Sequence, residues 1–172
     1  MRRRAWVAAL VLLLVAGAVY ARLLAGGPLG PVPGGWLRGE VVAQPVSDWS
    51  FARLARPLRV ESRARLLPHS TDPWFIVHEG RLHLLLTGLL HGGLLERLDE
   101  DPRIRVEVDG KIYEQVAVRV EDPAEISRLV RPGLRKLFAI ETVGEIRRTS
   151  AAGAGNLAVF RVENPRVAGA AP

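Results

Sequence analysis

Two histidines, His78 and His83, lie on either side of a predicted tight turn and could be taken for a metal-binding pair. In a hairpin closed by Glu79–Gly80 they would be diagonal neighbours on one face of a sheet. A metal site needs at least a third ligand, and no carboxylate or histidine stands at a defined spacing from this pair. The sequence therefore predicts packed or solvated histidines here and no metal site.

Two other polar stretches could carry chemistry. Asp99–Glu100–Asp101 has the look of a carboxylate cluster, but Pro102 follows it at a helix end, which favours a solvated turn. His69–Ser70–Thr71 lies in a predicted loop, from which it could reach a ligand or cap a turn ahead of Pro73. The sequence contains no Ser-His-Asp elbow, Walker loop, dinucleotide glycine fingerprint or HExxH motif. No catalytic residue can be named from it.

Composition limits the partners of the chain. It has 172 residues, 48% of them hydrophobic, and a net charge of +6, which fits one domain with additions. Four of the 24 basic residues flank an N-terminal apolar segment, so the rest of the chain has 20 basic against 18 acidic residues. No basic stripe with interleaved aromatic residues is present, so we expect no nucleic-acid partner. Without cysteine there is no disulfide and no Cys-based metal site.

The N-terminal segment from Ala5 to Ala21 carries no charge. As a helix it covers about 25 Å, and the residues up to Ala25, with Arg22 reaching toward the head groups, bring it near the thickness of a bilayer core. The arginines Arg2–Arg4 precede it, which predicts a single-pass anchor in the cytoplasmic membrane with the N-terminus inside and the remaining chain outside the cytoplasm. The alternative is a signal peptide cleaved before Arg22.

The composition also suggests boundaries. Residues 1–25 form the basic start and the anchor, and residues 26–35, "GGPLGPVPGG", form a linker rich in Gly and Pro. Residues 36–166 form the folded domain, and residues 167–172 a disordered tail.

Alternating patterns predict two hairpins inside the domain. The first joins residues 73–78 to 81–86 through Glu79–Gly80, and the second joins residues 103–108 to a strand from Lys111 through Asp109–Gly110. We expect the core-facing residues of the first hairpin to be Phe75, Val77, Leu82, Leu84 and Leu86. We expect those of the second to be Ile104, Val106, Val108, Ile112, Val116, Val118 and Val120.

The period then changes to that of a helix. Asp122 is suited to the N-cap, Pro123 to the first helical position, and Glu125 completes a capping box. Pro132–Gly133 is expected to interrupt this helix before a second short one, and Leu157–Pro165 is expected to be a last strand. The pattern predicts a mainly β, α+β domain with a late helical insertion, preceded by one transmembrane helix.

The segments "PWFIVHEGRLHLLLT", "LERLDEDPRIRVEVDGKIYEQVAVRVEDPAE" and "AVFRVENP" resemble the split β-barrel flavin-binding superfamily. Its members include pyridoxamine-phosphate-oxidase-like and deazaflavin-dependent nitroreductase-like proteins. The resemblance implies a split antiparallel β-barrel that binds FMN or a deazaflavin, often at the interface of a homodimer. Any turnover would be redox transfer to an unknown small substrate, with the electrons supplied by the cofactor.

By position in that family, Thr87 and His91 would face the cofactor phosphate, with His69, Ser70 and Trp74 near the ring. The segment "GLLHGGLLERL" departs from the pattern, because it lacks the Lys or Arg that cofactor binders carry soon after the threonine. Two alternatives therefore stay open. One is a non-catalytic split-barrel scaffold or binding module at the extracytoplasmic surface of the membrane, without a cofactor. The other is an apolar ligand held between the barrel and residues 88–95.

Overall fold

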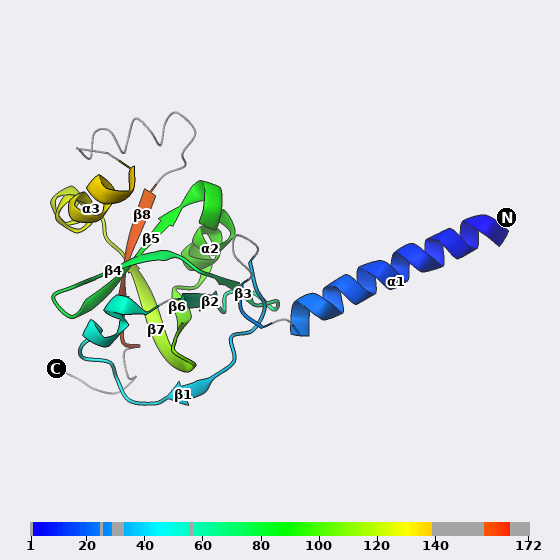
Figure 1. The fold of residues 1–172 in the computed structure, drawn as a ribbon, viewed down its shortest axis with the longest axis horizontal. Coiled ribbons are helices and arrows are strands. Elements are labelled where there is room, and N and C mark those ends of the chain that lie inside the picture. Colours follow the sequence, from blue (N-terminus) through cyan, green and yellow to red (C-terminus); the bar gives the residue numbers. More distant parts are fainter. Residues whose placement is uncertain (1, 25, 29–32, 56, 139–156, 166–172) are drawn as a thin grey trace.

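The computed structural model describes residues 2–24, 26–28, 33–55, 57–138 and 157–165 (Figure 1). The helical elements are α1 (Arg2–Leu24), the 3-10 helix η1 (Ser50–Leu54), α2 (Gly88–Glu100) and α3 (Pro123–Phe138). The strands are β1 (Glu40–Val42), β2 (Leu58–Ser62), β3 (His69–Thr71), β4 (Trp74–His78), β5 (Arg81–Thr87), β6 (Arg103–Val108), β7 (Lys111–Arg119) and β8 (Leu157–Glu163).

These strands form one sheet in the order β3-β2-β6-β7-β8-β5-β4, with β1 added in parallel beside β7 and all other pairs antiparallel. The two end strands, β3 and β4, are separated in the chain only by Asp72 and Pro73. Because so short a connection spans at most about 11 Å, the sheet must curl until its ends approach each other. The predicted mainly β, antiparallel class is confirmed.

The β4–β5 hairpin forms as predicted. Glu79 and Gly80 have φ angles of 50° and 73°, the positive values that a two-residue turn of this kind requires. The expected core residues of β5 are fully buried, and Phe75 and Val77 pack against them. We call this side of the sheet the inner face and the opposite side the outer face.

The β6–β7 hairpin also forms, with φ angles of 50° at Asp109 and 76° at Gly110, but one strand faces the other way from our prediction. In a two-residue hairpin the residues flanking the turn are directly opposite, so Val108 pairs with Lys111 and they share a face. The inner face of β7 is therefore made by Tyr113, Gln115 and Ala117. Ile112 and Val120 are buried away from it, whereas Val116 and Val118 are only partly buried.

Helix α3 begins as predicted, because the N–H of Ala124 donates to Oδ1 of Asp122 at 2.9 Å. The predicted interruption at Pro132–Gly133 is wrong, since α3 continues through it. An interior proline removes one hydrogen bond and bends a helix more readily than it ends one. On the outer face, Leu129 and Val130 of α3 pack with residues of β5 and β8 in a second apolar cluster.

Residues 69–71, predicted to be a loop, form the strand β3, which pairs with β2. The short polar sequence His-Ser-Thr carries no apolar alternation, and only the pairing with β2 makes it a strand. Its backbone also meets the end of the predicted linker. The N–H of Gly34 donates to the carbonyl of Ser70 at 2.7 Å, and the N–H of Ser70 to the carbonyl of Gly34 at 3.2 Å.

The N-terminal segment is helical, as predicted, and α1 projects away from the sheet (Figure 1). Its side chains from Trp6 to Ala21 are exposed. Within the part of the chain that the structure describes, no helix combines the length and the apolarity needed to cross a membrane, so the transmembrane part of the prediction is not supported. The predicted tail at 167–172 lies outside the described residues, and the domain boundaries stay predictions.

Candidate functional site

Thr87 and His91, the predicted phosphate residues, meet where β5 ends and α2 begins. Thr87 occupies the N-cap with extended backbone angles, and its side chain makes no capping hydrogen bond. His91 interrupts the helical geometry of α2 with φ −127° and ψ 18°, and its Nδ1 accepts a hydrogen bond from the Thr87 N–H at 3.2 Å. The imidazole thus accepts the hydrogen bond of one backbone amide at the start of the helix, an amide that a phosphate could otherwise use.

His91 is a buried structural residue in this arrangement. Only 5% of it is exposed, and burial lowers its pKa, against which a hydrogen bond with the backbone of Asp72 acts. Its ring is therefore neutral, and it links the start of α2 to the segment between β3 and β4. A neutral imidazole engaged on both sides offers no charge-assisted donor to a phosphate.

The Thr87 hydroxyl is the remaining polar group of this junction. Its Oγ1 is buried and has no hydrogen-bond partner among the described residues. An unpartnered buried oxygen is compatible with a ligand, but one hydroxyl screened from solvent does not hold a dianionic group. Because residues 87–95 include no Lys or Arg, the residues of this junction do not fit the phosphate of a flavin or deazaflavin.

The three residues predicted near the cofactor ring lie on β3 and β4, where side chains alternate between the two faces of the sheet. His69 points to the inner face and packs on α2, where a Cβ added to Gly93 would lie 3.0 Å from its Cε1. Ser70 points to the outer face, is fully buried, and lies against Gly34. Trp74 pairs with Leu85, on the outer face, and is 39% exposed. His69 and Ser70 cannot both face one ring, because neighbouring strand residues point to opposite faces.

The apolar residues after Thr87 fill the domain with their own side chains. Leu94 is fully buried and Leu98 is 5% exposed, and both belong to the inner core together with β5 and β6 residues. Leu90, by contrast, is 51% exposed. The part of α2 that was expected to cover an apolar ligand contributes directly to the core.

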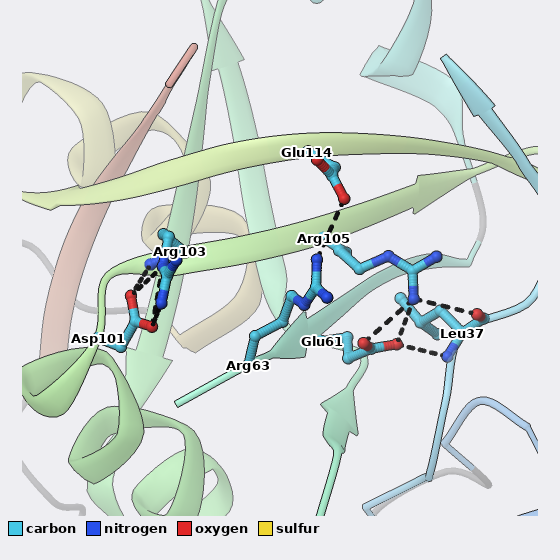
Figure 2. Close-up of polar contacts among 7 residues, drawn as sticks. All are labelled: Leu37, Glu61, Arg63, Asp101, Arg103, Arg105 and Glu114. Atoms are coloured by element: carbon cyan, nitrogen blue, oxygen red, sulfur yellow. Dashed lines mark hydrogen bonds and ion pairs between the residues drawn. The ribbon is translucent and has the colours of Figure 1, made fainter. Parts of the chain in front are cut away.

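A buried ion pair that the sequence analysis missed lies on the outer face of β2 and β6 (Figure 2). Glu61 is fully buried, and its carboxylate accepts from Arg105 Nη1 at 3.2 Å and from the Leu37 N–H at 2.6 Å. The same Nη1 lies 3.5 Å from the Leu37 carbonyl. Glu61 and Arg105 are directly opposite in the sheet, a relation that the sequence cannot show without knowing that β2 pairs with β6.

The two histidines of the first hairpin are diagonal neighbours on the outer face, as predicted. His83 is 2% exposed, whereas the His78 side chain is 52% exposed, with its Nε2 3.7 Å from Glu79 Oε1. Among the described residues, no group of three or more metal-binding side chains is gathered closely enough to hold an ion. Arg161 of β8 pairs directly with His83 across the sheet.

No protein-family model and no curated protein matches this sequence. Solved structures are similar at low identity. The conserved hypothetical protein Rv2991 of Mycobacterium tuberculosis is 19% identical, with a TM-score of 0.49 over 74% of this chain and 86% of that one. A candidate pyridoxamine 5'-phosphate oxidase of Listeria innocua is 16% identical, with a TM-score of 0.48 over 64% and 85%. HutZ, the heme storage protein of Vibrio cholerae, is 16% identical, with a TM-score of 0.45 over 68% and 87%. Likeness at this level assigns no ligand and no activity to the chain.

Proposed function

We propose that this chain is a non-catalytic binding module built on a split-barrel-like domain, and that it does not use a flavin at the β5–α2 junction. The observation that carries the proposal is the state of His91. It is buried and neutral, and it bonds to Thr87 and the Asp72 backbone, so it takes up the position that the resemblance assigns to a residue facing a cofactor phosphate.

The proposal includes a tether at the membrane. It is supported by the exposed apolar side chains of α1, which include Leu12 and Val15 at 75% and 57% exposure. Exposed apolar surface of this extent is stabilised in a lipid environment, and Arg2–Arg4 before it favour retention on the cytoplasmic side. The domain would then lie at a membrane surface, and its place on the extracytoplasmic side is proposed from the arginines alone.

A titration of the full chain with FMN, FAD and a deazaflavin cofactor tests the first part. We expect no saturable change in absorbance or fluorescence, because the junction lacks charged donors. Saturable binding in the micromolar range, lost in Thr87→Val and kept in Trp74→Phe, would contradict the proposal and restore the cofactor interpretation.

Flotation with lipid vesicles tests the tether. The double variant Leu12→Arg and Val15→Arg should lose vesicle binding, since each arginine puts a charge on the apolar surface that would enter the lipid. Leu66→Arg is the matched control, because Leu66 is a 94% exposed leucine in the β2–β3 connection. Equal flotation of the double variant and the parent chain would rule out the tether.

A further inference from the structure

A pocket of about 300 Å³ opens on the outer face, where the first turns of α3 pass over the turn end of the β4–β5 hairpin. The sheet contributes Arg81, His83 and Arg161 to its lining, and α3 contributes Glu125 and Arg128. This is far along β5 from Thr87, since Arg81 and Thr87 are the two ends of that strand. The pocket is therefore separate from the junction at which the cofactor was predicted.

His83 is a buried polar group whose hydrogen bonding is incomplete. Only 2% of its surface is exposed, and its Nδ1 has no hydrogen-bond partner among the described residues. Buried polar atoms in folded proteins nearly always have a partner, and an unpartnered one destabilises the fold. Because His83 is one of the residues that line the pocket, a group bound there is a candidate for the partner that this nitrogen lacks.

The charged side chains of the pocket divide into engaged and free ones. Arg161 is engaged, with Nε 2.7 Å from Glu163 Oε1 and Nη1 3.4 Å from Glu125 Oε1. Asp122, another lining residue, accepts the capping hydrogen bond from the Ala124 N–H.

Within the described part of the chain, neither Arg81 nor Arg128 forms an ion pair or a side-chain hydrogen bond, and both are exposed. The lining carries three arginines and three acidic residues, so its formal charge is balanced. Two of those acids are engaged as described, whereas two of the arginines are not. The groups left to meet a ligand are therefore mainly cationic.

We propose that this pocket binds a small molecule through an oxyanion, a phosphate or a carboxylate, which lies between the guanidinium groups of Arg81 and Arg128 and gives Nδ1 of His83 its missing partner. Guanidinium groups suit both anions, because their planar fork matches paired oxygens. The volume is at the lower end of the range for small-molecule sites, so the ligand is small.

This inference names a ligand class for the binding module proposed above and rests on that function. The three groups come from β5 and α3, and they line one pocket only because α3 returns over the hairpin. No local motif could have indicated the site.

Calorimetric titration of the full chain, in a mild detergent, with inorganic phosphate and with succinate tests the proposal. We expect saturable binding of at least one probe at millimolar concentration or below. Arg81→Gln and Arg128→Gln should each weaken it about tenfold, as expected for loss of one charge-assisted hydrogen bond. His83→Leu should weaken it as well. The matched control is Arg103→Gln, which removes the same charge from a 73% exposed side chain paired with Asp101 outside the pocket.

The outcomes separate the sources of the anion. Binding of phosphate alone identifies a phosphate ligand, and binding of succinate alone identifies a carboxylate ligand. Absence of binding for both, in a chain whose urea unfolding is cooperative, would overturn the proposal. It would also be overturned if Arg103→Gln weakened binding as much as Arg81→Gln, since that would show unspecific attraction to a basic chain. The flavin titration is independent of these results, so the two proposals fail separately.

Discussion

Two buried polar groups on the outer face of the same sheet, Glu61 and His83, differ in how completely they are bonded. Each lies directly opposite an arginine on the neighbouring strand, Arg105 and Arg161 respectively. Glu61 is bonded by that arginine and by the backbone of Leu37. His83 has an unpartnered Nδ1, and its arginine is engaged by two glutamates. The comparison indicates that the first group stabilises the fold and the second is available for a ligand.

The energetics support that distinction. A buried ion pair adds little net stability over an apolar pair, but removing one member leaves a buried charge and is costly. An unpartnered buried nitrogen lowers stability in the free protein, and sites that bind ligands commonly carry such a cost. The Glu61 cluster also ties residues before β1 to the sheet, because Leu37 supplies both a donor and an acceptor to it (Figure 2).

The largest effect is expected from breaking the Glu61 cluster. Arg105→Ala should lower the free energy of unfolding by about 3–5 kcal/mol, because it leaves the carboxylate buried without its cation. Urea unfolding of the full chain measures this. The matched control is Arg63→Ala, which breaks the exposed pair with Glu114 and should cost at most about 1 kcal/mol. Similar losses of unfolding free energy in the two variants would show that the Glu61–Arg105 pair stabilises the fold no more than an exposed ion pair does.

The opposite sign is expected at His83. His83→Leu should leave stability unchanged or raise it by about 1 kcal/mol, since it replaces an unpartnered polar group with an apolar one beside Ile76 and Leu85. The same variant should lose binding of phosphate or succinate. A loss of stability comparable to that of Arg105→Ala would mean that His83 is a structural residue.

Acidification should weaken the fold through the two buried histidines. Burial lowers the pKa of both His83 and His91. At His83, the polar backbone of Arg81 and the charge of Glu125 act against this lowering of the pKa, whereas Arg161 and His78 add to it. The unfolded chain therefore binds protons first, so the stability from the neutral rings is complete above about pH 6.5 and falls as the pH drops below it.

The histidine contribution can be isolated by comparing variants. His91→Gln should reduce the loss of unfolding free energy between about pH 7.5 and pH 5.5, because one proton uptake by the unfolded chain is removed. In the parent chain, saturating phosphate should also reduce the loss of unfolding free energy between these pH values, because an anion beside His83 favours its protonated form. An unchanged pH dependence in His91→Gln would contradict its neutral, buried state.

The smallest effect is expected in α2, away from both Glu61 and His83, where packing alone should decide the change in stability. Gly92→Ala should stabilise the chain by about 0.5–1 kcal/mol, since a Cβ there meets nothing within 4 Å. Gly93→Ala should gain less or lose stability, because its Cβ would lie 3.0 Å from His69 Cε1. Thermal unfolding of the pair measures the difference, and equal gains would contradict the packing of His69 on α2.

The sequence predicted the features that depend on adjacent residues. Both hairpin turns, the N-cap at Asp122 and the inner face of β5 follow from local residue types, and each is confirmed. The face of β7 was wrong, because the alternation of apolar residues after Lys111 was followed in place of the pairing rule at the turn. The carboxylate–arginine pair and the pocket at His83 depend on β2–β6 and β5–β8 pairing between distant segments, which no spacing in the sequence specifies.

Nitrogen-detected NMR of the imidazoles during a phosphate titration tests the central claim most directly. The full chain has four histidines, and His83→Leu identifies the resonances of His83. We expect Nδ1 of His83 to shift saturably and the pKa of His83 to rise, while the resonances of His91 stay unchanged. A response of His91 without one of His83 would place the anion at the β5–α2 junction and contradict the account, and so would the absence of any response.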